Sequence, residues 1–184
     1  MFTYLASVFL IFLSLGCIFC CTKKLKKTVI GEDDSLILSP TVYKGTELKL
    51  SGYYYSLGNK RIQQSYFLYN NGCLICGGGS DESANPNAFL ENVFTSNSFD
   101  ANIKKTKSYW GLFKIEGSKI FLEHWYPTEP PLKSALKEGV ILNDTTFKIM
   151  SIQRSNGSEF KEITEFYSFR QFKQKPDSTN SFIK

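Results

Sequence analysis

The sequence predicts an all-β protein, an antiparallel up-and-down meander of about eight strands that closes into a barrel, with one short helix inserted after the third strand. Aromatic residues make up 15% of the 184 residues, including 16 Phe and 10 Tyr, and this composition favours strands over helices. Turn signals follow one another at short spacing between residues 46 and 172. Closing the sheet would remove the exposed edges that long aromatic strands otherwise present.

The first two strands are indicated by alternation between apolar and polar residues. Residues 46–55 alternate, Gly58-Asn59 supplies a turn, and the pattern continues through residues 62–68. Asn70-Asn71-Gly72 then gives the strongest hairpin signal in the chain, because Asn and Gly accept the positive φ that tight hairpin turns require.

The third strand, residues 73–76, ends at a run of three glycines. Asn85-Pro86 follows and precedes a predicted helix over residues 87–95, where apolar side chains recur at helical spacing.

The second half of the chain predicts the remaining strands. Its turn signals are Gly117-Ser118, Asn143-Asp144 and Asn156-Gly157. The strands predicted around them cover residues 110–115, 120–126, 140–142, 145–152 and 159–172.

The chain divides into four segments. Residues 1–21 form a signal peptide or membrane anchor, 22–45 a tether, 46–172 the β domain, and 173–184 a polar, flexible tail. The β domain is long enough to bury a core of its own.

The leader determines where the protein is held. Residues 2–21 carry no charge and are mostly apolar, which suits either a secretory signal or a membrane-spanning helix. Leu15-Gly16-Cys17 resembles the lipobox of bacterial lipoproteins, and this resemblance implies acylation of Cys17 and a place in the cell envelope, periplasmic or at the outer membrane. Cys21 is a second candidate for the same modification.

Two alternatives to a lipoprotein remain. No Lys or Arg precedes the apolar run and four lysines follow it, which under the positive-inside rule indicates an uncleaved anchor with a cytoplasmic domain. An ordinary cleaved signal peptide is the other alternative.

The charge of the chain is concentrated next to this leader. The formal net charge is +5, and without the four lysines at positions 23, 24, 26 and 27 it falls to +1. The domain is therefore almost neutral, so nucleic acid is excluded as an expected partner and the lysines are interpreted as juxtamembrane.

The strand patterns resemble the lipocalin-like domains of bacterial lipoproteins, over about residues 46–172. The resemblance is carried by Gly52-Tyr53-Tyr54-Tyr55 and by residues 67–72, 109–115 and 139–142. Tyr54 stands where true lipocalins have the Trp of a Gly-x-Trp motif. The composition, rich in Lys, Asn, Ile, Phe and Tyr, also resembles proteins of AT-rich bacteria such as the Bacteroidota. The family resemblance implies a barrel that binds a small apolar ligand.

Residues that carry chemistry are few. Cys73 and Cys76 form a CxxC, but positions i and i+3 of a strand face opposite sides, so the pair is interpreted as structural, with redox and metal roles as the alternatives. His124 is the single histidine and has no motif around it. We therefore expect a protein that is not an enzyme and that uses no cofactor or metal.

Large aromatic side chains on the predicted strands are candidates for lining a cavity. They either surround a small ligand or fill the core, in which case the protein is an interaction or structural protein of the envelope. The candidates are Tyr54, Tyr66, Trp110, Phe113, Trp125 and Phe147.

Overall fold

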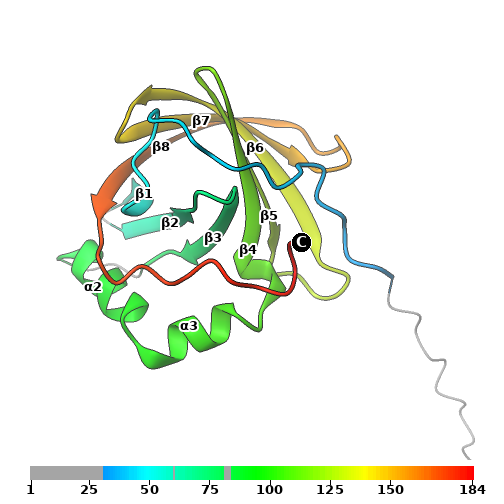
Figure 1. Cartoon of the computed structure of the whole chain (residues 1–184). Helices are drawn as coiled ribbons and strands as arrows, with labels where there is room; N and C mark the ends of the chain where they lie inside the picture. Colours follow the sequence, from blue (N-terminus) through cyan, green and yellow to red (C-terminus); the bar gives the residue numbers. More distant parts are fainter. Residues whose placement is uncertain (1–30, 60, 81–83) are drawn as a thin grey trace, which may run out of the picture. The chain divides into compact units, whose positions relative to one another are not determined.

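The computed structural model describes residues 31–59, 61–80 and 84–184, and the described residues form a closed barrel of eight antiparallel strands (Figure 1). Each strand pairs with the next, and β8 closes the barrel by pairing with β1. The predicted meander and its closure are confirmed. The strands are β1 (Gly52–Gly58), β2 (Arg61–Leu68), β3 (Cys73–Gly78), β4 (Trp110–Glu116), β5 (Lys119–Tyr126), β6 (Lys133–Asn143), β7 (Thr146–Arg154) and β8 (Lys161–Gln171).

The turns between strands lie where the sequence predicts them. Gly72 has a φ of 82° in the β2–β3 hairpin, and a Cβ at this position would lie 2.4 Å from the Thr41 carbonyl oxygen. Glycine is therefore required here both for the backbone conformation and for the close approach of another segment.

Two helices follow the third strand, α2 (Pro86–Phe94) and α3 (Asn97–Ile103), and a 3₁₀ turn η1 (Lys107–Tyr109) leads into β4. The first helix confirms the prediction, and its Asn85 Oδ1 accepts the Ala88 N–H at 3.1 Å as an N-cap. The second helix was not predicted. Its two buried residues, Phe99 and Ile103, are four positions apart and form its apolar face.

The sheet separates two apolar clusters, one inside the barrel and one outside it. Successive side chains of a strand point to opposite faces, so Tyr54 belongs to the inner cluster and Tyr53 to the outer one. The helices α2 and α3 cover the outer cluster beside one wall of the barrel (Figure 1).

Inside the barrel, aromatic rings gather at one end. Phe147 stacks on Tyr167 with ring centroids 4.8 Å apart, and its centroid is 5.0 Å from that of Tyr54. The segment before β1 closes this end, because Leu48 is buried in the inner cluster and its N–H donates to the Tyr43 hydroxyl at 2.9 Å. This end of the barrel is therefore packed with the protein's own side chains.

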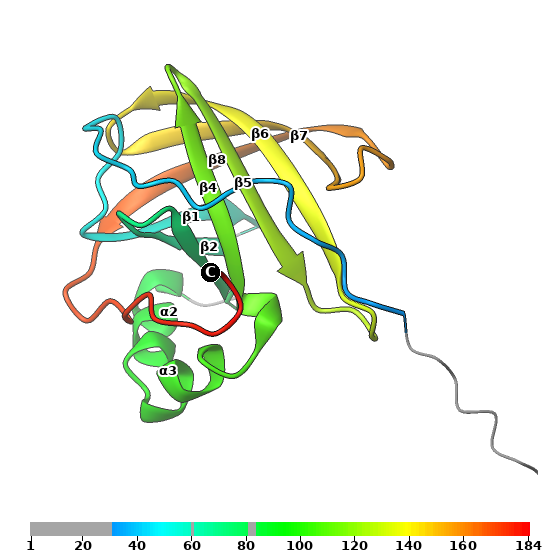
Figure 2. The same ribbon diagram turned by 45° about the vertical axis from the view of Figure 1, so that its right-hand side comes forward.

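Residues 31–45 are not a free tether. This segment crosses the outer face of β5 (Figure 2), where the buried Glu123 carboxylate accepts the N–H groups of Ile37 and Leu38 at 2.8–3.0 Å. The Trp125 indole N–H donates to the Asp34 carbonyl at 2.6 Å. The tether prediction was wrong for the described part of the segment, because partners more than 80 residues away satisfy its polar groups.

Replacing Glu123 with Gln is expected to lower the free energy of unfolding by about 1–3 kcal/mol, because an amide has one acceptor oxygen where the carboxylate uses two. Urea unfolding measures the loss, and hydrogen exchange at Ile37 and Leu38 locates it. Glu138→Gln on the adjacent strand β6 is the matched control, since its side chain is 41% exposed and its carboxylate pairs with the exposed Lys119. Unchanged protection of both amides in Glu123→Gln would contradict the assignment.

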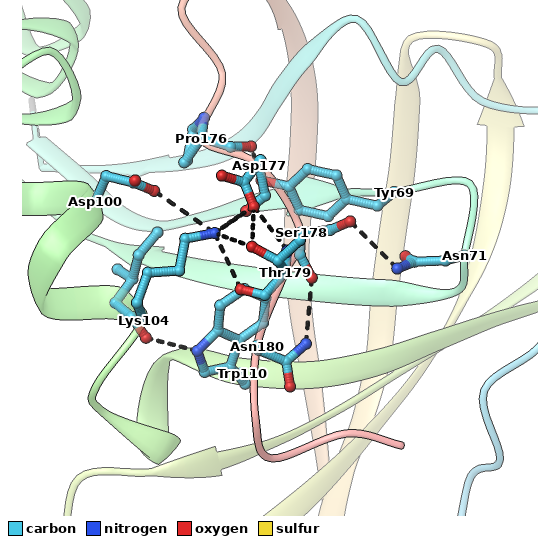
Figure 3. Close-up of polar contacts among 11 residues, drawn as sticks. Tyr69, Asn71, Asp100, Lys104, Trp110, Pro176, Asp177, Ser178, Thr179 and Asn180 are labelled. Carbon is cyan, nitrogen blue, oxygen red and sulfur yellow. Dashed lines mark hydrogen bonds and ion pairs between the residues drawn. The ribbon is translucent and has the colours of Figure 1, made fainter.

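The C-terminal tail, predicted to be flexible, is also bound to the domain. Lys104, just after α3, donates its ammonium group to the Asp177 carboxylate and to the Thr179 carbonyl at 3.0 Å (Figure 3). The Tyr69 hydroxyl donates to the Pro176 carbonyl at 2.6 Å. Hydrogen bonding to Lys104 lowers the pKa of Asp177 to about 2. The tail prediction was wrong, because a polar composition does not indicate which cations and hydroxyls lie nearby.

Candidate functional site

Opposite the aromatic end, the interior of the barrel becomes polar. The strands β2, β3, β5, β6 and β8 each direct a polar or charged side chain inward near this end, at positions where the alternation would otherwise place an apolar residue. The pairing register brings them to neighbouring levels, since Tyr66 opposes Cys76 and Leu122 opposes Lys137. These side chains are Gln64, Cys76, His124, Lys137 and Glu165.

His124 is held in one tautomer. Its Nδ1 lies 2.8 Å from the Trp125 carbonyl oxygen, which can only accept, so Nδ1 carries the proton. Its Nε2 therefore accepts the hydroxyl of Tyr66 at 3.2 Å. Burial, assisted by the positive charge of Lys137, lowers the pKa of His124 to about 4, so the ring is neutral at pH 7.

Lys137 and Glu165 form the ion pair of this interior. The ammonium Nζ is 2.8 Å from Glu165 Oε2, which also accepts the Tyr167 hydroxyl at 2.9 Å. Only 10% of the Lys137 side chain is exposed, and a cation this deeply buried needs a paired anion. Burial, and secondarily the Glu165 charge, raises the pKa of Tyr167 well above its ordinary value, so the phenol stays a hydrogen-bond donor.

A pocket of about 380 Å³ adjoins this polar interior. Its charged lining consists of three cations, Lys137, Arg154 and Lys161, and one anion, Glu159. The rest of its lining is Gln64, His124, Tyr126, Ala135, Ile152 and Gln153. Cationic and apolar surfaces therefore meet in one cavity at the end of the barrel.

Arg154 is the most unusual member of this lining. Its side chain is 10% exposed, and its Nη2 pairs with Asp34 Oδ2 at 2.5 Å. Its Nε is buried and has no hydrogen-bond partner among the residues that the structure describes. A buried donor without an acceptor is costly, and this atom is closed off from the pocket by the groups around it.

The six aromatic residues predicted to line a cavity separate into two groups. Tyr54, Tyr66, Phe113 and Phe147 belong to the inner cluster of the barrel. Trp110 and Trp125 belong to the outer cluster, and their assignment to an interior cavity was wrong.

The prediction failed because both tryptophans occupy strand positions whose side chains point to the outer face of the sheet. Trp110 opposes Ile75, which is also an outer residue, and its indole N–H donates to the Ile103 carbonyl of α3. None of the six residues is part of the pocket lining. The sequence does contain one signal for the polar site. His124 follows the apolar Leu122 by two residues on the same strand, so both side chains point to the same, inner face of the sheet.

The two cysteines of the CxxC lie on opposite faces of β3 and are free, so the prediction that they do not pair with each other is confirmed. Cys76 packs inward, where its sulfur is 2.8 Å from Gln64 Nε2, and Cys73 opposes the outward-facing Leu112. Burial raises the pKa of both thiols, which keeps them protonated and weakly nucleophilic at pH 7.

No protein-family model, curated protein or solved structure matches this chain. None of the helices among the described residues is long and apolar enough to cross a membrane. The predicted anchor and Cys17 lie outside the described residues.

Proposed function

We propose that this protein is a non-enzymatic, lipocalin-like binding module of the bacterial cell envelope, which takes a small molecule into the pocket at the polar end of its barrel. The observation that carries the proposal is the division of the interior into a packed aromatic end and a polar end with an adjoining pocket of about 380 Å³. This volume is within the roughly 300–1,000 Å³ typical of small-molecule sites.

The hydrogen bonding of the polar residues supports binding rather than catalysis. Both ring nitrogens of His124 have partners within the protein, and its low pKa makes it a poor proton acceptor at pH 7. The Lys137 ammonium is paired with Glu165. These groups are fixed in place, which suits a preformed binding site.

Native mass spectrometry of the full chain, extracted from membranes in mild detergent, tests ligand binding. We expect a bound small molecule on the wild-type protein and on Met150→Trp, and its loss from Ile152→Trp, which places a large side chain in the pocket lining. Met150 lies on the same strand but lines an outer groove, so it is the matched control. Wild-type protein that carries no small molecule would contradict the proposal.

We further propose that acylated Cys17 holds the module at the membrane, with the domain in the periplasm or at the outer membrane. Cys17→Ser is expected to abolish acyl labelling and detergent partitioning, while Cys21→Ser retains both. Loss in Cys21→Ser alone would move the anchor to Cys21. Membrane association without an acyl label in any of these proteins would indicate an uncleaved helix with a cytoplasmic domain.

A second candidate function, protein interaction, is favoured by an outer groove of about 620 Å³ along β6, β7 and β8. Large apolar side chains are exposed there, Phe160 by 61% and Met150 by 44%, and Phe166 on β8 is exposed by 54%. Neighbouring exposed apolar residues of this size are typical of interaction surfaces. Crosslinking in intact cells tests this candidate, since Phe160→Ser is expected to remove a crosslinked partner if the groove binds one.

A further inference from the structure

The pocket at the polar end of the barrel is chemically asymmetric. Three cations and one anion line it, and that anion, Glu159, is 69% exposed and lies 3.7 Å from Arg154 Nη1. Such exposed pairs contribute little and separate easily. The two buried charged side chains of the lining, Lys137 and Arg154, are therefore both cations, and their partners Glu165 and Asp34 lie outside the lining.

Asp34 contacts only one of the three nitrogen atoms of the Arg154 guanidinium group. A guanidinium group offers five N–H donors in a planar fork, and Asp34 occupies Nη2. Asp34 is fixed in turn, because the same Oδ2 accepts the Ser134 N–H at 3.0 Å. The Nε–H is left as a buried donor without an acceptor among the described residues.

Lys137 is the second cation that can reach the same ligand. It opposes Ile152 across the β6–β7 pair, and Arg154 opposes Ala135, so the two cations occupy diagonal positions on adjacent strands. Diagonal neighbours in an antiparallel pair lie roughly 7–8 Å apart, a separation that one anionic group between their side chains can bridge. The Lys137 ammonium has three N–H donors, and among the residues that the structure describes it uses two of them, toward Glu165 and the Tyr167 hydroxyl.

We propose that the ligand of this pocket is a small organic monocarboxylate, whose carboxylate accepts hydrogen bonds from the Arg154 guanidinium group and the Lys137 ammonium group while its apolar part packs against Tyr126, Ala135 and Ile152. This inference rests on the proposed binding function and specifies its ligand class. The nearby carboxylates of Glu159 and Glu165 favour a single negative charge over a doubly charged phosphate, because each additional charge meets their repulsion.

Isothermal titration calorimetry of the detergent-solubilised full chain at pH 7 tests the inference with three carboxylates, hexanoate, benzoate and 4-phenylbutyrate. At least one is expected to bind the wild-type protein. Its neutral primary amide and inorganic phosphate are each expected to bind about tenfold or more weakly, because loss of a charge-assisted hydrogen bond is a change of that size.

Two variants locate the binding. Arg154→Met and Arg154→Lys are both expected to weaken carboxylate binding about tenfold or more, since neither has a planar guanidinium group. Arg154→Lys keeps a cation beside Asp34, so it reports on the missing donor even if Arg154→Met is destabilised. Lys148→Met, on the same strand but in the outer groove, is the control and is expected to bind as the wild type does.

The outcomes separate this inference from the function on which it rests. Equal affinity for carboxylate and amide, or undiminished binding by Arg154→Lys, would overturn the anionic ligand and leave a binding pocket in place. Failure of all three carboxylates to bind would also overturn the inference, while native mass spectrometry of the membrane-extracted protein decides the binding function independently.

Discussion

Replacing Trp110 with Ala is expected to lower the free energy of unfolding by about 3–5 kcal/mol, as measured by equilibrium unfolding in urea. Trp110 is fully buried in the outer cluster beneath the helices, and its indole N–H donates to the Ile103 carbonyl at 2.6 Å. The substitution removes one of the two indole rings of that cluster and leaves the carbonyl without its donor. We therefore expect α3 to lose its attachment to β4.

Two further variants make this result interpretable. Phe160→Ala, at a ring 61% exposed, removes a comparable aromatic side chain and is expected to change stability by less than about 0.5 kcal/mol. Trp110→Phe keeps one aromatic ring and loses the N–H donor together with part of the buried volume, so its cost is expected to be about 1–3 kcal/mol. A Trp110→Ala protein as stable as the wild type would show that the helices do not depend on this contact.

Lowering the pH from 7 to 5 is expected to lower the free energy of unfolding by about 2 kcal/mol through His124 alone. The pKa of this residue is about 4 in the folded protein and near the ordinary 6.5 when unfolded. The unfolded chain therefore binds more protons than the folded protein. The contribution of His124 to stability is present above about pH 6.5 and is lost as the pH falls toward 4. His124 is the only histidine in the chain, which makes the effect traceable to one group.

Urea unfolding at a series of pH values measures this dependence, and His124→Gln is expected to be nearly flat between pH 7 and 5. Three carboxyl groups have a lowered pKa because of hydrogen bonds: Asp33 to Lys107, Asp34 to the Ser134 N–H, and Asp177 to Lys104. Their contributions to the free energy of unfolding are lost only as the pH falls below about 4, outside the range in which His124 titrates. The imidazole proton resonances of the folded wild type give a direct check. A midpoint near 6.5 in that titration would refute the buried, neutral histidine.

The strand order and most turns of this protein could be predicted because their signals are local. A hairpin turn at Gly72 or Gly117 requires a residue that accepts positive φ, and such residues are visible in the sequence wherever the chain reverses. The strand limits were less accurate. β6 begins at Lys133, seven residues before its predicted start, because its polar residues before Gly139 are paired on both sides by β5 and β7.

The candidate site was not predictable in the same way. Histidine, lysine and glutamate usually lie on the surface of a protein. Closure of the sheet places His124, Lys137 and Glu165 inside the barrel, where His124 contacts Tyr66 and Lys137 pairs with Glu165. Arg154 acquires its role from Asp34, 120 residues earlier in the chain. A single sequence carries no local pattern for a contact of that separation.

By itself the sequence determined an antiparallel β meander with its hairpins, the position of the first helix, the near neutrality of the domain and the separation of the two CxxC thiols, because each depends on neighbours along the chain. The tertiary structure decided the rest. It placed Trp110 and Trp125 outside the barrel, bound residues 33–43 and the C-terminal tail to its surface, and gathered the polar site at one end. The physical reason is that burial and long-range pairing, which only closure of the barrel creates, determine whether a polar side chain remains in solvent or becomes part of a site.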